Sequence, residues 1–268
     1  MGPPRRLTLD QSAGTKPVDW TADSRAVVLL SVHNGKLGVY KQRVDETTRE
    51  PLFDFGKAPG ILPRLTGDGS EILYAETDRP NDPNAPVSLM AVPIGGGTPR
   101  VILQEPGVGD AQCAKPPSQV CILNEFVAGT SFYYLLDLHH GKGRLIAKLP
   151  GLVNYGLSPD GSTLALDDAR TVRFVSIDSG IVKDVVVKDW PVRKSADWSA
   201  DGKALLVASV NTQDVPVVLS FDIEGNVKVL LQGDRNIPFR WVIPSPDGKY
   251  GALAVSTGES NVWMVENY

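Results

Sequence analysis

Polar and charged residues recur near the first strand of successive repeats in this 268-residue chain. They are Asp19, Arg64, Asn154, Tyr155, Asp197 and Arg240. Carboxylates accept hydrogen bonds and guanidinium groups donate them, so such side chains around one axis could hold a polar ligand or a peptide of a partner protein. Alternatively, they pair with one another and with water, because buried charges are seldom left unpaired. These residues are the candidate binding site.

The two cysteines, Cys113 and Cys121, lie close together in the sequence. When the third repeat is aligned with the fifth, Cys113 falls at Asp197 and Cys121 at Leu205, on neighbouring strands of a hairpin. Opposed positions of this kind predict a disulfide bond. A disulfide indicates an oxidising compartment. The alternative is a pair of buried free thiols in a cytosolic protein.

The sequence offers little for metal, nucleophilic or cofactor chemistry. His139 and His140 precede a Gly-Lys-Gly turn, where consecutive side chains diverge, so we expect solvated turn residues rather than metal ligands. Residues 78–84 carry oxygen ligands but lack the glycine and bidentate glutamate of a calcium-binding loop. The chain has neither a GxSxG elbow nor a phosphate-binding GxxxxGK loop. We therefore assign no catalytic residue, no metal ligand and no cofactor.

The elements that position these residues are marked by a repeated six-residue phrase. It reads WTADSR from Trp20, LTGDGS from Leu65, LSPDGS from Leu157, WSADGK from Trp198 and PSPDGK from Pro244. Asp-Gly suits a tight turn between strands because glycine tolerates positive φ and aspartate can bond the backbone ahead of it. A short apolar strand follows each copy. Tight turns spaced about 40–50 residues apart are typical of the four-stranded blades of a propeller.

The repeats predict an all-β fold, a six-bladed β-propeller of four-stranded antiparallel blades in one domain over residues 1–268. The predicted blades cover about residues 18–57, 58–107, 108–152, 153–191, 192–236 and 237–268. The third blade has KPPS from Lys115 in place of the Asp-Gly turn. The last has only three strands, so we expect residues 2–10 to add the fourth and close the ring. Seven blades and a β-sandwich are the alternatives.

Composition narrows the class of protein. The chain is 42% hydrophobic with a formal net charge of −4, and its mean hydropathy is −0.10. These values predict a soluble globular protein, and we expect a monomer. The acidic balance gives no basic patch for nucleic acid. No apolar run is long enough to span a membrane.

The repeated phrase, with WSADGK from Trp198 as its fullest copy, resembles the TolB-like and WD40-like (PD40) propeller repeats of bacteria. The resemblance covers nearly the whole chain, and the third repeat and Pro244 depart from its pattern. Residues 113–121, residues 135–148 and the ending SNVWMVENY are similar to a branch in which the propeller follows a Ser/Thr kinase or a winged-helix DNA-binding domain. The resemblance implies an accessory sensor or protein-interaction module. The turn motif is specific for the fold but not for a function.

We therefore expect a non-catalytic binding or sensor module of a bacterial signalling or envelope protein, located outside the cytoplasm in the periplasm. Its ligand would be a protein or a small polar molecule at the channel mouth. One alternative is a propeller hydrolase or lyase with its site in the channel, although Asp19 and Asp197 alone are too few carboxylates for a metal-dependent lactonase-type site. A passive structural scaffold is the other alternative.

Overall fold

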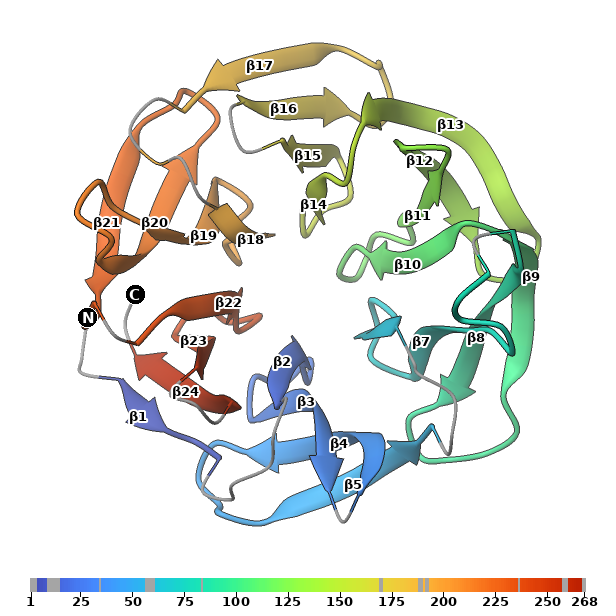
Figure 1. Ribbon diagram of the computed structural model, residues 1–268, viewed down its shortest axis with the longest axis horizontal. Helices are drawn as coiled ribbons and strands as arrows, with labels where there is room; N and C mark the ends of the chain where they lie inside the picture. Colours follow the sequence, from blue (N-terminus) through green and yellow to red (C-terminus); the bar gives the residue numbers. More distant parts are fainter. Residues whose placement is uncertain are drawn as a thin grey trace.

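The strands of the protein are arranged as a ring of sheets around one axis. The structure, a computed structural model, describes residues 4–8, 15–33, 35–55, 61–82, 84–168, 171–187, 190, 193–235, 237–256 and 260–266. Every regular element within those ranges is a β-strand. The strands form six sheets of four antiparallel strands each (Figure 1). The fold is therefore the predicted six-bladed propeller.

The six sheets follow one another along the chain, and we number them as blades 1 to 6. Blade 1 contains β2 (Lys16–Trp20), β3 (Ala26–His33), β4 (Lys36–Arg43) and β5 (Arg49–Asp54). Blade 2 contains β6 (Ile61–Leu65), β7 (Glu71–Glu76), β8 (Pro86–Pro93) and β9 (Arg100–Pro106). Blade 3 contains β10 (Val108–Cys113), β11 (Cys121–Val127), β12 (Thr130–Asp137) and β13 (Gly141–Pro150). Blade 4 contains β14 (Asn154–Leu157), β15 (Thr163–Asp167), β16 (Thr171–Ser176) and β17 (Val182–Val186). Blade 5 contains β18 (Arg193–Trp198), β19 (Ala204–Val210), β20 (Pro216–Asp222) and β21 (Val227–Gln232). Blade 6 contains β22 (Phe239–Pro244), β23 (Tyr250–Ser256), β24 (Ser260–Glu266) and β1 (Arg5–Arg6). The first strand of each blade in this order is its inner strand, nearest the axis (Figure 1).

The ring is closed by the N-terminal strand, as the sequence predicts. Strand β1 pairs with β24, with Arg5 opposite Met264. Beyond β1, Leu7 N donates to Val262 O at 2.9 Å, and Val262 N donates to Thr8 Oγ1 at 3.0 Å. Blade 6 thereby joins the two ends of the chain. Residues 2, 3, 9 and 10 of the predicted strand lie outside the described residues.

The repeated phrase forms the turn between the inner strand and the second strand of a blade. In blade 2, Asp68 accepts hydrogen bonds from Thr66 Oγ1 at 2.7 Å and from Ser70 N at 3.0 Å. Gly69 adopts φ +73°, which only glycine takes at low cost. The same hydroxyl-to-carboxylate bond occurs in the pairs Thr21–Asp23, Ser158–Asp160, Ser199–Asp201 and Ser245–Asp247. The aspartates of the phrase are thus turn-forming residues.

Two tryptophans of the phrase join neighbouring blades. The indole N–H of Trp20 donates to Ile243 O of blade 6 at 2.9 Å, and that of Trp198 donates to Gly156 O of blade 4 at 2.9 Å. Both side chains are buried. Burial removes a large apolar surface from water while the N–H group keeps a partner. These contacts hold the inner strands at a fixed spacing around the axis.

The third blade contains the predicted disulfide but in a different register from the one expected. Cys113 lies directly opposite Cys121, with a Cα–Cα distance of 4.0 Å. Trp198 lies opposite Leu205 in blade 5, so Cys113 corresponds to Trp198 and not to Asp197. The turn of blade 3 is one residue longer than that of blade 5, and an alignment without a gap conceals this. Gln112 is therefore the counterpart of Asp197.

Candidate functional site at the channel mouth

A cavity of about 750 Å³ lies at the end of the channel where the inner strands turn into the second strands. Every blade contributes at least one small or cyclic residue from this turn. These residues are Ala22, Gly67, Pro116, Pro159, Ala200 and Pro246. Because their side chains are short or held in a ring, they leave the mouth open. The volume falls in the range of sites for small molecules.

Three of the candidate residues line this cavity together. Asp19, Arg64 and Asp197 are the next-to-last residues of β2, β6 and β18. Arg64 Nη1 lies 3.6 Å from Asp197 Oδ2 and donates to Val18 O at 2.8 Å. Because the three residues occupy the same position in their inner strands, they lie at one level of the axis although they are far apart in the sequence.

Asp19 is held by three donors from three different segments. Its Oδ1 accepts from Trp20 N at 2.8 Å, and its Oδ2 accepts from Leu65 N at 3.2 Å. Lys115 Nζ of blade 3 lies 3.3 Å from Asp19 Oδ1. The Asp19 side chain is buried, and these contacts replace the water that a carboxylate loses on burial.

The other candidate residues do not line the cavity. Asn154 is exposed at the first residue of β14, at the far end of that strand from the cavity. Arg240 is exposed beside a register shift between Phe239 and Trp241, where the alternation of side chains along β22 is interrupted. The Tyr155 hydroxyl is buried beside Asp110, deeper in the molecule.

Several polar residues near the axis were missed by reasoning from the sequence. Lys115 and Gln112 line the cavity, and the Gln112 side-chain oxygen accepts from Leu157 N at 2.9 Å. Asp110 and Lys16 lie further along the inner strands of blades 3 and 1. A gapped alignment of blade 3 would have revealed Gln112 as the counterpart of Asp197. The charged Lys115, in a turn where other blades carry small residues, was a second signal.

Comparison with known proteins identifies the fold. No known protein family matches the sequence, and no curated protein does so either. Among solved structures, TolB from Acinetobacter baumannii is 16% identical with a TM-score of 0.62, over 93% of this chain and 63% of the TolB chain. The chain has the TolB-like propeller fold. It spans less than two thirds of the length of TolB.

Two enzymes share the fold of this TolB-like propeller. An oligogalacturonate lyase in complex with manganese is 12% identical with a TM-score of 0.66, over 98% of this chain and 92% of the lyase. Puromycin hydrolase is 15% identical with a TM-score of 0.59, over 93% of this chain and 44% of the hydrolase. At these identities the likeness concerns the fold alone.

The charges along the axis of this TolB-like propeller are balanced. Asp19, Asp110 and Asp197 face the cations Lys16, Arg64 and Lys115. Burial raises the pKa of Asp110 and of Asp197, and the positive charge of Arg64 opposes that rise in both. Burial also lowers the pKa of Lys16. Asp110 and Asp197 therefore take up protons more readily than exposed carboxyl groups do.

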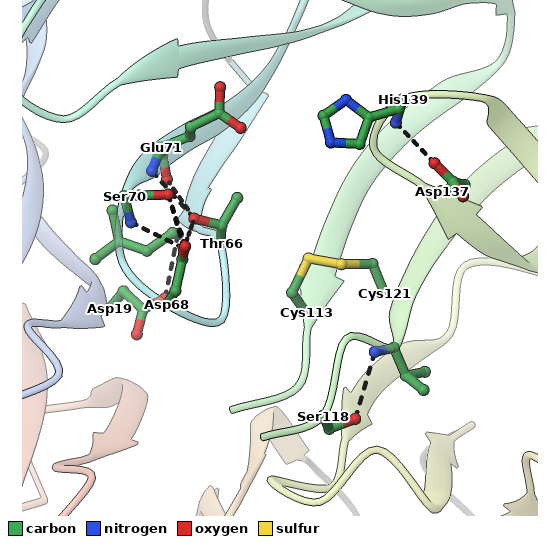
Figure 2. The surroundings of a disulfide bond; sticks show 12 residues. Asp19, Thr66, Asp68, Ser70, Glu71, Cys113, Ser118, Cys121, Asp137 and His139 are labelled. Carbon is green, nitrogen blue, oxygen red and sulfur yellow. Dashed lines mark hydrogen bonds between the residues drawn. A yellow bond between two sulfur atoms is a disulfide. The ribbon is translucent and has the colours of Figure 1, made fainter. Parts of the chain in front are cut away.

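His139 and His140 lie in a turn on the rim of blade 3. Asp137 Oδ1 accepts from His139 N at 2.8 Å and from His140 N at 2.9 Å, and these bonds lower the pKa of Asp137 to about 2. Figure 2 shows the bond to His139 in the surroundings of the Cys113–Cys121 disulfide. In the part of the chain that the structure describes, no three His, Cys, Asp or Glu side chains are grouped so as to hold a metal ion. The described part of the chain also contains no helix long and apolar enough to cross a membrane.

Proposed function

We propose that this TolB-like propeller is a non-catalytic binding or sensor module, and that a protein segment or a small polar ligand enters the cavity at the channel mouth. The observation that carries the proposal is the convergence of all six blades on one open cavity with Asp19, Arg64 and Asp197 on its floor. The carboxylates there are fixed by backbone N–H groups of Trp20, Leu65 and Trp198. A floor fixed in this way is preorganised for recognition.

The module is proposed to work outside the cytoplasm, in the periplasm, as an accessory domain of a bacterial signalling or envelope protein. The Cys113–Cys121 disulfide supports an oxidising compartment. Fractionation of the native cells, with alkylation of thiols before lysis, tests this part. Free thiols in a cytoplasmic fraction would refute it.

The binding function can be tested by blocking the cavity. Ala22 lines the cavity from an exposed position, so Ala22→Trp fills space without removing a hydrogen bond. Ile181→Trp is the matched control, because Ile181 is 70% exposed and does not line the cavity. Tagged wild-type protein and both variants are incubated with native envelope extract, with and without crosslinking. Captured proteins and small molecules are then identified by mass spectrometry.

The expected result is a ligand retained by the wild type and by Ile181→Trp but lost from Ala22→Trp. A ligand retained equally by all three proteins would place recognition elsewhere on the molecule. If no ligand is captured, the passive scaffold becomes the better description.

A hydrolase or lyase acting in the same cavity is the second candidate function. Its support is the fold shared with oligogalacturonate lyase and puromycin hydrolase, together with the partly buried Asp197 carboxyl, whose pKa is raised by desolvation. A raised pKa suits a general acid. Incubating a captured small molecule with the protein separates the two functions. Chemical conversion that is lost in Asp197→Asn would establish an enzyme, whereas release of the unchanged molecule supports a binding module.

A further inference from the structure

The acceptor groups on the cavity floor are already engaged by the protein. Asp19 accepts from Trp20 N and Lys115 through Oδ1 and from Leu65 N through Oδ2. Asp197 accepts from Trp198 N through Oδ1, and its Oδ2 faces Arg64. Every oxygen of these two carboxylates therefore has a partner.

The donor groups on the same floor retain unused capacity. An ammonium group has three N–H donors, and Lys115 directs one contact to Asp19. Arg64 uses only Nη1, for Val18 O and Asp197, so its Nε and Nη2 make no hydrogen bond to any residue that the structure describes. These positively charged N–H groups therefore have free capacity for a ligand.

Gln112 adds an uncharged donor to the two cationic ones, Lys115 and Arg64. Leu157 N donates to the Gln112 side-chain oxygen, and this bond fixes which end of the amide is the oxygen. The amide NH₂ group then has no hydrogen-bond partner among the described residues. Gln112, Lys115 and Arg64 all line the same cavity.

We propose that the cavity recognises an oxyanion-bearing group, a carboxylate or a phosphate, which accepts hydrogen bonds from Lys115, Arg64 and Gln112. This inference rests on the proposed binding function and specifies its ligand. A ligand that only donates hydrogen bonds would leave the three donors unsatisfied, which costs free energy in a partly enclosed site. Charge-assisted hydrogen bonds to an oxyanion would be the strongest contacts available on this floor.

The charge balance at the axis is compatible with an anionic ligand. Three carboxylates and three cations already offset each other there, so an anionic ligand adds net negative charge at the axis. Asp110 and Asp197 are partly buried carboxyl groups close to Arg64, and their raised pKa values allow them to take up a proton when an anion arrives. Binding of the oxyanion is therefore expected to be linked to proton uptake.

The proposal is tested by calorimetric titration of the whole chain with probes matched in shape. The probes are succinate, its neutral diamide succinamide, the diamine 1,4-diaminobutane and inorganic phosphate. Gln112→Glu is the sharpest variant, because it keeps the acceptor for Leu157 N and converts the free donor into an acceptor. Lys115→Met removes the ammonium group. Lys203→Met is the control, because Lys203 occupies the turn of blade 5 outside the cavity and its ammonium group contacts Asp201.

The expected result is that succinate, phosphate or both bind to the wild type, and that succinamide and 1,4-diaminobutane do not. Affinity should fall about tenfold or more in Gln112→Glu and in Lys115→Met, as for loss of one charge-assisted hydrogen bond, and stay unchanged in Lys203→Met. Binding of succinate alone assigns a carboxylate ligand, and binding of phosphate alone assigns a phosphate ligand. Circular dichroism and the unfolding midpoint show whether each variant is folded.

Two outcomes would overturn the inference. If 1,4-diaminobutane or succinamide binds in preference and is lost in Ala22→Trp, the cavity is a binding site for another class of ligand. In that case the proposed function stands and the oxyanion assignment fails. If none of the four probes binds, the oxyanion assignment also fails, and the capture experiment decides the proposed function independently.

Discussion

Lys115 of blade 3 reaches across the channel mouth to Asp19 of blade 1, with 3.3 Å between Nζ and Oδ1, although the two residues are 96 positions apart in the sequence. Blade 2 lies between the two blades in the ring (Figure 1). The contact therefore bridges alternate blades. It places one ammonium group and one carboxylate on the cavity floor.

The two ends of this contact should differ in their importance for stability. Asp19→Ala removes the acceptor for two backbone N–H groups and should lower the free energy of unfolding by about 1–3 kcal/mol. Lys115→Met removes a partly exposed partner and should cost less than about 1 kcal/mol. Urea unfolding at neutral pH measures both. Equal losses in the two variants would show that Asp19 matters only through Lys115.

The indole N–H of Trp198 is expected to stabilise the contact between blades 4 and 5. Trp198→Phe removes the hydrogen bond to Gly156 O and leaves unfilled volume between the blades. The free energy of unfolding should fall by about 2–4 kcal/mol. Trp263→Phe is a useful comparison, because the Trp263 indole N–H is buried without a hydrogen-bond partner among the described residues. A larger loss in Trp263→Phe would contradict the importance of the bond to Gly156.

Removal of the disulfide should destabilise the protein without changing its fold. The bond joins residues 8 apart in the sequence, so it closes a short loop. A loop of this length corresponds to about 2–3 kcal/mol in the chain-entropy description. Thermal unfolding of the wild type with and without reductant measures the effect. The double variant Cys113→Ala, Cys121→Ala should be insensitive to reductant, and a reductant effect in it would point to another cause.

The turn aspartates predict a defined pH dependence. Hydrogen bonds from Thr66 and Ser70 lower the pKa of Asp68, so folding favours its ionised form. The resulting stabilisation is present above the unfolded-state pKa of about 4 and is lost as the pH falls through the lower folded-state value. Asp68→Ala should therefore be less stable than the wild type at pH 7, by less than about 1 kcal/mol because the site is exposed.

Urea unfolding of Asp68→Ala over a pH series checks this sign. The difference from the wild type should shrink as the pH falls below about 4. A difference that stays constant down to the lowest pH would show that the carboxylate charge plays no part in the turn.

Two neighbouring tyrosines offer a paired test of buried hydroxyl groups. Tyr133 and Tyr155 pack together with ring centroids 5.2 Å apart. Tyr133 OH donates to Val153 O at 2.9 Å, whereas the buried Tyr155 OH lies beside Asp110 without a hydrogen bond of normal geometry to any described residue. Tyr133→Phe should cost about 1 kcal/mol, and Tyr155→Phe should be neutral or slightly stabilising. The opposite order in chemical unfolding would show that the Tyr155 hydroxyl does bind a partner.

The repeated phrase was enough to predict the propeller. Asp68 and Gly69 form their turn through contacts within five residues, so the sequence alone carries the signal. The spacing between such turns then predicts the blades. The pairing of Cys113 with Cys121 was also predicted, because both cysteines flank a single hairpin turn. Local chemistry and spacing determine these features.

The composition of the cavity floor was decided by the tertiary structure. Arg240 and Asn154 have the expected residue types, but a bulge in β22 and the length of β14 place them away from the cavity. Gln112 was concealed by one extra residue in the turn of blade 3, because a shift of one residue along a strand exchanges the side chain that faces the axis.

Contacts between blades on different sides of the ring cannot be predicted from a local sequence pattern. Whether Lys115 meets Asp19 depends on the closure of six blades and on the distance that closure leaves across the mouth. The sequence by itself determined the strands and their turns, because these arise from interactions between near neighbours, and the spacing of the repeats predicted six blades. The tertiary structure decided which side chains converge on the axis, because that depends on the register and tilt of strands brought together from the whole chain.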